Sequence, residues 1–245
     1  MNKTQKLINV GLKLMEKTHD PLHNRNHVER VISTTQTIAH KQNLSDHDTQ
    51  ALALAAAWHD VARIITRRPS MFIMLALDDL FSAFMLTWYG IINFSFRYEV
   101  RIAIWLLLAK SAITGRIIKL TMLRRRYRTL LQILKDADVI DVIHPERTSI
   151  AFDMAQNSRY YRTGYRMLIR WTLRTRPIST YTMEARDNLF QNLQIMRDWV
   201  MSPPITKLHT MMFGPEWAEI YSISIERLIR ENSPVLDQKM IKSSS

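Results

Sequence analysis

Apolar residues recur at every third or fourth position through almost the whole chain, a spacing typical of helices. No stretch alternates apolar and polar residues between turn-forming pairs, as the strands of a hairpin would. The pattern therefore predicts an all-α protein. The helices are expected over residues 3–18, 25–42, 46–65, 71–91, 96–112, 116–143, 147–173, 181–201 and 215–232.

Three ionisable segments interrupt this apolar pattern. His59 and Asp60 directly follow the alanine-rich run 51–58, where burial of a charged group is costly unless it is paired. Asp138 lies in an expected helix that is apolar nearly all round, so its carboxyl group needs either a proton or a cation. His23 and His27 are four residues apart and share a helix face if that turn is helical.

A divalent metal ion would bind the histidine and aspartate side chains of all three segments and so compensate for their burial. The chain has no cysteine, so a metal must be held by histidine and carboxylate groups. Such an ion lowers the pKa of bound water and withdraws charge from a phosphoryl oxygen, which suits phosphate-ester hydrolysis. The alternatives are structural: His59 as an ordinary core histidine, and Asp138 in a buried salt bridge to an arginine.

In these segments the chain resembles the HD-domain superfamily of metal-dependent phosphohydrolases. The matching stretches are "HNRNHVERV", "WHDVAR" and "KDADVIDVI". The resemblance implies an HD-domain-like helical bundle in which a bound divalent ion (Mn, Co, Ni, Fe or Mg) activates water to cleave a phosphate ester. The expected substrate is a phosphorylated small molecule, a nucleotide. The metal ligands that it implies are His27, His59, Asp60 and Asp138.

Besides Asp60, two cationic residues are candidates for the catalytic apparatus. Lys110 stands where some members of the superfamily carry a further histidine, which suggests a single metal with Lys110 as a phosphate contact. Arg63 follows the doublet and is a candidate phosphate clamp. The alternatives are that Lys110 extends outward to solvent and that Arg63 is a solvated cation at a helix C-terminus.

The charge of the chain supports a second hypothesis. Its net charge is +12, from 34 Lys and Arg against 22 Asp and Glu, and arginines and tyrosines interleave from Arg159 to Arg176. Basic groups neutralise phosphates, and tyrosines offer stacking faces. The alternative function is therefore an HD-like module with little or no catalysis that binds nucleic acid, an anionic membrane or a partner protein.

The expected organisation is a metal-binding core over 1–145, a basic helical extension over 146–234 packed on that core, and a flexible tail over 235–245. The N-terminal segment is expected to be an amphipathic helix and not a secretion signal. The most apolar window, 71–94, contains Asp78 and Asp79, which would be costly inside a bilayer. A cytoplasmic location is therefore expected, with peripheral membrane association as a further possibility.

Overall fold

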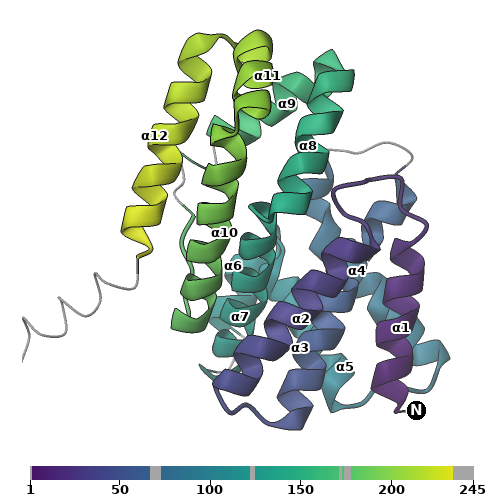
Figure 1. Cartoon of the computed structure of the whole chain (residues 1–245). Helices are drawn as coiled ribbons and strands as arrows, with labels where there is room; N and C mark the ends of the chain where they lie inside the picture. Colours follow the sequence, from purple (N-terminus) through teal and green to yellow (C-terminus); the bar gives the residue numbers. More distant parts are fainter. Residues whose placement is uncertain (1, 67–72, 122–124, 171–172, 174–177, 234–245) are drawn as a thin grey trace, which may run out of the picture. The chain divides into compact units, whose positions relative to one another are not determined.

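The computed structural model describes residues 2–66, 73–121, 125–170, 173 and 178–233, and it is helical throughout, with no strand in these ranges. The predicted all-α fold is confirmed (Figure 1). The elements are α1 (Lys3–Met15), α2 (Arg25–Lys41), α3 (Asp46–Trp58), the 3₁₀ helix η1 (Val61–Ile65), α4 (Ile73–Ile92), α5 (Tyr98–Lys110), α6 (Gly115–Thr121), α7 (Arg125–Val142), α8 (Pro145–Asn157), α9 (Arg159–Arg170), α10 (Met183–Met201), α11 (Pro203–Phe213) and α12 (Pro215–Glu231).

Several expected helices are divided. The helix expected over 46–65 ends at Trp58 and continues as η1, and the one expected over 147–173 is broken at Ser158, whose backbone is extended. The sequence does not predict α11 (Pro203–Phe213), because two successive prolines, Pro203 and Pro204, indicate a break. Both prolines instead begin the helix, where the missing amide hydrogens would have had no intrahelical acceptor.

The chain forms two compact units, Met1–Asp138 and Val139–Ser245, and the division falls within α7. The sequence places the end of the core at residue 145. The expected flexible tail over 235–245 lies outside the described residues.

In the first unit, α3 forms the centre of the core. Ser45 caps its N-terminus by accepting a hydrogen bond from the Asp48 amide, and every residue of the run 51–58 is buried against its neighbours α1, α2 and α5. Gly11 lets α1 approach closely, because a Cβ there would lie 2.6 Å from the Ala57 carbonyl oxygen. The Trp58 indole donates to the Leu7 carbonyl at 2.9 Å, which fixes the end of α3 against α1.

Helices α4 and α5 form an αα-hairpin of the first unit. Asp78 and Asp79 of α4 are buried or nearly so, and both are ion-paired within this unit. No helix in the described ranges has the combined length and hydropathy needed to cross a bilayer.

The second unit contains α8 to α12 and has an aromatic core. The His209 ring stacks on Phe152 with centroids 4.3 Å apart, and its Nε2 accepts a hydrogen bond from the Tyr165 hydroxyl at 3.0 Å. Its Nδ1 donates to the Ile205 carbonyl at 3.1 Å. Both ring nitrogens are therefore used by the neutral imidazole, and burial lowers the pKa of His209 to about 4.

We expect this histidine to make the second unit acid-sensitive. Its folded pKa is below the unfolded value of about 6.5, so its neutral form supports folding fully above that pH. The contribution, about 3 kcal/mol, is lost as the pH falls from about 6.5 to 4. Urea unfolding at several pH values gives the free energy of unfolding as a function of pH. Between pH 4 and 6.5 this free energy should rise more steeply with pH in wild type than in His209→Gln. Parallel pH profiles of the two proteins would contradict it.

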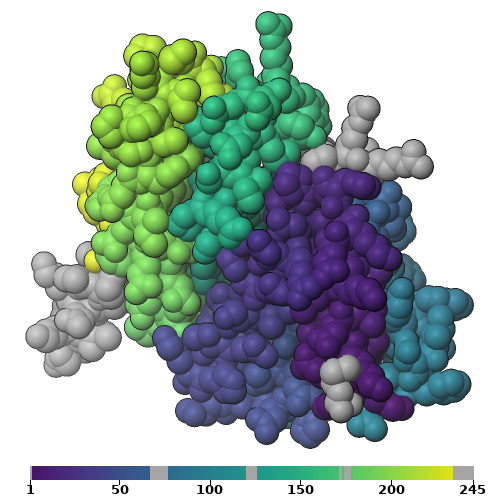
Figure 2. Space-filling model, turned by 45° about the vertical axis from the view of Figure 1, so that its right-hand side comes forward, coloured from purple at the N-terminus to yellow at the C-terminus, as the bar shows by residue number. Residues whose placement is uncertain are grey.

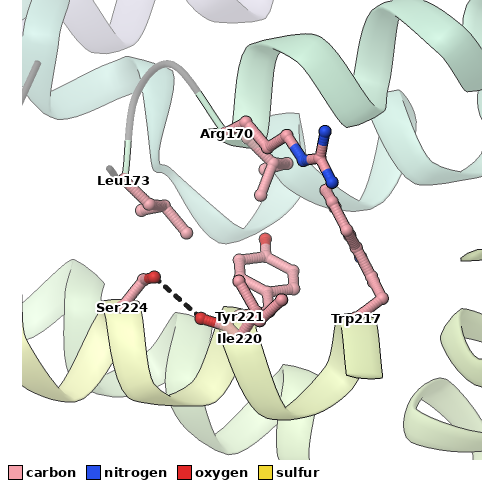
Figure 3. A pocket seen from close by; sticks show the side chains of 7 residues that line it. Arg170, Leu173, Trp217, Ile220, Tyr221 and Ser224 are labelled. Carbon is pink, nitrogen blue, oxygen red and sulfur yellow. Dashed lines mark hydrogen bonds between the residues drawn. The ribbon is translucent and has the colours of Figure 1, made fainter. Parts of the chain in front are cut away.

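A small pocket in the second unit is shown in Figure 3. Its volume is about 10 Å³, room for roughly one water molecule. The Ser224 hydroxyl donates to the Ile220 carbonyl at 2.7 Å, and the guanidinium of Arg170 lies over the Trp217 ring. These polar groups are therefore engaged within the fold. The residues that line the pocket are Ile169, Arg170, Leu173, Trp217, Ile220, Tyr221 and Ser224.

Candidate metal centre

His27 reaches the centre from the first turn of α2. The Asn24 side chain caps this helix by accepting a hydrogen bond from the His27 amide at 3.1 Å, and the imidazole is fully buried. Because α2 begins at Arg25, His23 does not share a helix with His27. The two rings nevertheless meet edge to face, and Nδ1 of His23 lies 2.8 Å from Oδ2 of Asp20.

His59 and Asp60 are brought together by the end of α3. Nδ1 of His59 donates to the Ala56 carbonyl at 2.7 Å, which fixes the tautomer and leaves the lone pair on Nε2. At Asp60 the backbone departs from helical geometry and η1 begins. Successive side chains of a continuous helix do not face each other, so this break is what lets Oδ2 of Asp60 lie 3.2 Å from Nε2 of His59.

Three buried side chains converge on one point. Nε2 of His27 lies 3.0 Å from Nε2 of His59 and 3.1 Å from Oδ2 of Asp60. All three ligand-type atoms lie within 4.8 Å of one another, so His27, His59 and Asp60 could together hold a metal ion. Two imidazole nitrogens and a carboxylate oxygen are donors suited to Mn, Fe, Co, Ni or Zn.

The fourth predicted ligand, Asp138 of α7, lies at the edge of this cluster. Its Oδ1 is 3.7 Å from Nε2 of His59, and its Oδ2 is 3.0 Å from Nζ of Lys110. Burial would raise the pKa of Asp138, but Lys110 and His59 outweigh burial and hold it well below the usual range. The carboxylate is therefore ionised and able to contribute an oxygen to a cation.

Lys110 does not extend outward to solvent. Its ammonium group bridges two carboxylates, at 3.0 Å from Asp138 and 3.1 Å from Asp79. Burial opposes the charged form, yet these two carboxylates raise the pKa of Lys110 above its ordinary value. The phosphate contact predicted for Lys110 stays a prediction, and in this geometry the lysine first neutralises Asp79 and orients Asp138.

Arg63 is buried in η1 and is not a solvated helix-end cation. Its guanidinium pairs with Oδ2 of Asp20 at 3.1 Å, Oδ1 of Asp60 at 3.5 Å and Oδ2 of Asp78 at 2.5 Å. With these three partners its donors are directed into the protein. Its closest partners are Asp20 and Asp78, and Asp60 lies slightly farther away. The phosphate clamp predicted for Arg63 stays a prediction.

The charge of this region favours a proton or a cation at the centre. Among the described residues, the permanently charged Arg63 and Lys110 face five carboxylates, those of Asp20, Asp60, Asp78, Asp79 and Asp138. Burial of excess negative charge is costly unless protons or a metal ion neutralise it. Burial by itself would lower the pKa of His59, but Asp60 and Asp138 raise it to about 9. The cluster thus strongly attracts positive charge to Nε2 of His59.

Asp20, Asp78 and Asp79 were not predicted as part of this region. A signal for two of them was present, because Asp78 and Asp79 form an acidic doublet in an apolar helix just as His59 and Asp60 end one. In the sequence, that doublet indicates only that the apolar segment does not span a membrane. Asp20 carries no comparable signal, since it precedes a proline in an ordinary turn segment.

Comparison of the chain with protein-family models, with curated proteins and with solved structures gave no match.

Proposed function

We propose that this protein is a metal-dependent phosphohydrolase that cleaves a phosphate ester of a nucleotide. The observation that carries the proposal is the buried convergence of His27, His59 and Asp60 on one point. When bound there, a divalent ion supplies the Lewis acidity that makes water nucleophilic near neutral pH. These three residues would hold the ion, with Asp138 as the additional oxygen donor.

The remaining residues of the centre have supporting tasks. The positive charge of Arg63 lies 3.5 Å from Oδ1 of Asp60, while Oδ2 faces the two imidazoles. The Ala56 carbonyl keeps His59 in the tautomer whose Nε2 lone pair is available to the ion. Lys110 lies against Asp138 at the edge of the cluster, where its positive charge would favour an approaching phosphate.

The rival hypothesis, a binding module without catalysis, depended on the basic C-terminal third. Some of these arginines make contacts within the second unit. The guanidinium groups of Arg166 and Arg170 each lie 5.8 Å from the centre of the Trp217 ring. Arg162 donates to the carbonyls of Ala155 and Gln156 at the end of α8. These contacts give the three arginines a structural task, although Arg166 and Arg170 stay exposed, and the enzymatic hypothesis is preferred because of the buried His27–His59–Asp60 cluster.

The test is metal analysis of the purified full chain combined with a substrate panel. We expect about one divalent ion per chain. We also expect release of phosphate from p-nitrophenyl phosphate or a nucleotide in the presence of Mn, Co, Ni, Fe or Mg. A chelator should abolish the release, and the same metal should restore it. Bound metal without turnover, together with RNA binding that weakens steeply with salt, would instead support the binding module.

A further inference from the structure

The exposed apolar side chains of this protein are concentrated on one part of the first unit. Of the nineteen large hydrophobic side chains that are exposed in the described residues, ten lie between residues 81 and 117. We call this set the α4–α6 apolar face. Its members are Phe81, Phe84, Trp88, Ile91, Ile92, Phe94, Phe96, Trp105, Ile113 and Ile117.

Helix α4 contributes the largest share of this face. Its exposed members follow the helical period, since Phe81, Phe84, Trp88 and Ile91 are three or four residues apart and thus lie on one side of the helix. The acidic residues of α4, Asp78 and Asp79, are buried or nearly so. Part of this segment is seen at the right-hand edge of Figure 2, in blue to teal. A helix side of this kind needs an apolar environment that the described chain does not supply.

The turn after α4 exposes an aromatic side chain to an even greater extent than α4 does. Phe94 is 86% exposed and has a positive φ of 46°, a conformation that is uncommon for a bulky residue. Its carbonyl accepts a hydrogen bond from Nζ of Lys3 at 3.0 Å, which ties the turn to α1. The fold thus holds an aromatic ring at the tip of a turn in a conformation that costs free energy. Such local cost is commonly found where a residue has a functional contact.

The exposed charges within the stretch that forms this face have one sign. Between residues 80 and 121 the only acidic residue is Glu99, which is buried and lies 2.5 Å from Nδ1 of His47. The exposed charged residues of that stretch are Arg97, Arg101 and Arg116. A partner must therefore offer an apolar region for the aromatic rings and, directly beside it, negatively charged groups for the arginines.

We propose that the α4–α6 apolar face docks on the surface of an anionic lipid bilayer. Aromatic and aliphatic side chains enter the boundary between headgroups and acyl chains, while arginines at the same level contact lipid phosphates. A second copy of the chain fits less well, because a two-fold contact would bring these arginines together with no carboxylate to neutralise them. The proposal does not depend on the metal centre or on the proposed hydrolysis.

Vesicle flotation of the full chain tests the proposal. We expect binding to vesicles of phosphatidylcholine with 30% phosphatidylglycerol, and much weaker binding to phosphatidylcholine alone. The triple variant Phe84→Ser/Trp88→Ser/Phe94→Ser should bind at least tenfold more weakly. Its matched control, Met183→Ser/Met211→Ser/Ile223→Ser, removes three equally exposed apolar residues from the second unit and should bind like wild type.

The charge contribution is tested separately. Arg101→Gln/Arg116→Gln should weaken binding to the anionic vesicles by about fivefold per arginine at low salt. Arg159→Gln/Lys207→Gln, which removes two exposed cations of the second unit, should not. The proposal is overturned if wild type does not float with anionic vesicles or if both triple variants lose binding equally. It is also overturned if light scattering shows a wild-type dimer that the first triple variant converts to a monomer, since the face would then be a self-association surface.

Discussion

The proposed metal centre predicts that replacement of Asp60 by asparagine removes both the metal and the hydrolytic activity. The substitution keeps the size of the side chain but deletes the charge that faces two imidazoles at 3.1 and 3.2 Å. We expect metal affinity to fall by more than about a hundredfold, since even residues that only support a ligand contribute roughly 10- to 100-fold. Phosphate release should fall by about a thousandfold or more, because the reaction depends on the ion. Metal analysis and the rate with the best substrate measure the two effects.

The matched control is Asp46→Asn at the other end of the same helix. Asp46 is exposed in the first turn of α3, and its substitution should leave metal content and rate close to those of wild type. Circular dichroism of both variants checks that the helices are intact. If Asp60→Asn kept a full equivalent of metal while the protein remained folded, the assignment of the centre would be wrong.

The largest expected loss of stability comes from Arg63→Met. This substitution leaves the side-chain volume nearly unchanged but removes the cation that pairs with Asp20, Asp60 and Asp78. Burial and the charge of Asp60 raise the pKa of Asp78 to about 7, so this carboxyl group depends on Arg63 to stay ionised at neutral pH. Removal of one partner from a buried ion pair costs about 3–5 kcal/mol. Urea unfolding of the metal-free protein measures the loss directly.

Two further variants show whether uncompensated charge is the cause. Arg25 also pairs with two carboxylates, Glu16 and Glu29, but on the surface, so Arg25→Met should change the free energy of unfolding far less. Addition of Asp78→Asn to Arg63→Met should recover about 1–3 kcal/mol, because Asp78 without Arg63 must take up a proton to stay buried at neutral pH, whereas asparagine is neutral without one. Equal destabilisation by Arg25→Met and Arg63→Met would show that Arg63 does not neutralise a buried cluster.

The sequence located the helices better than it located their ends. The periodic apolar pattern required helices around 25–42 and 181–201, and α2 and α10 lie there. The break after Trp58 was not predicted, because Val61, Ala62 and Ile64 continue the apolar pattern of α3 without a glycine or proline. The break nevertheless matters for the centre, since it lets two adjacent side chains face the same point.

The roles of Lys110 and Arg63 show a second limit of prediction from the sequence. The sequence singles out Lys110 by its place in the resemblance and Arg63 by its position after the His59–Asp60 doublet, both as candidate phosphate contacts. Which negative partner each cation has is a question of distance between residues far apart in the sequence. Asp79 is 31 positions from Lys110, and Asp20 is 43 positions from Arg63. Spacing within one segment contains no information about such pairs.

What the sequence determined by itself is the helical fold and the types of residue that gather in the centre. Both follow from local chemistry: apolar periodicity makes helices, and ionisable groups that end or interrupt apolar helices must be neutralised. Only the tertiary structure decided how they are neutralised, with His27, His59 and Asp60 converging on one point while Arg63 and Lys110 hold the surrounding carboxylates. The physical reason is that electrostatic partners are chosen by distance in the folded chain, which depends on the packing of all the helices together.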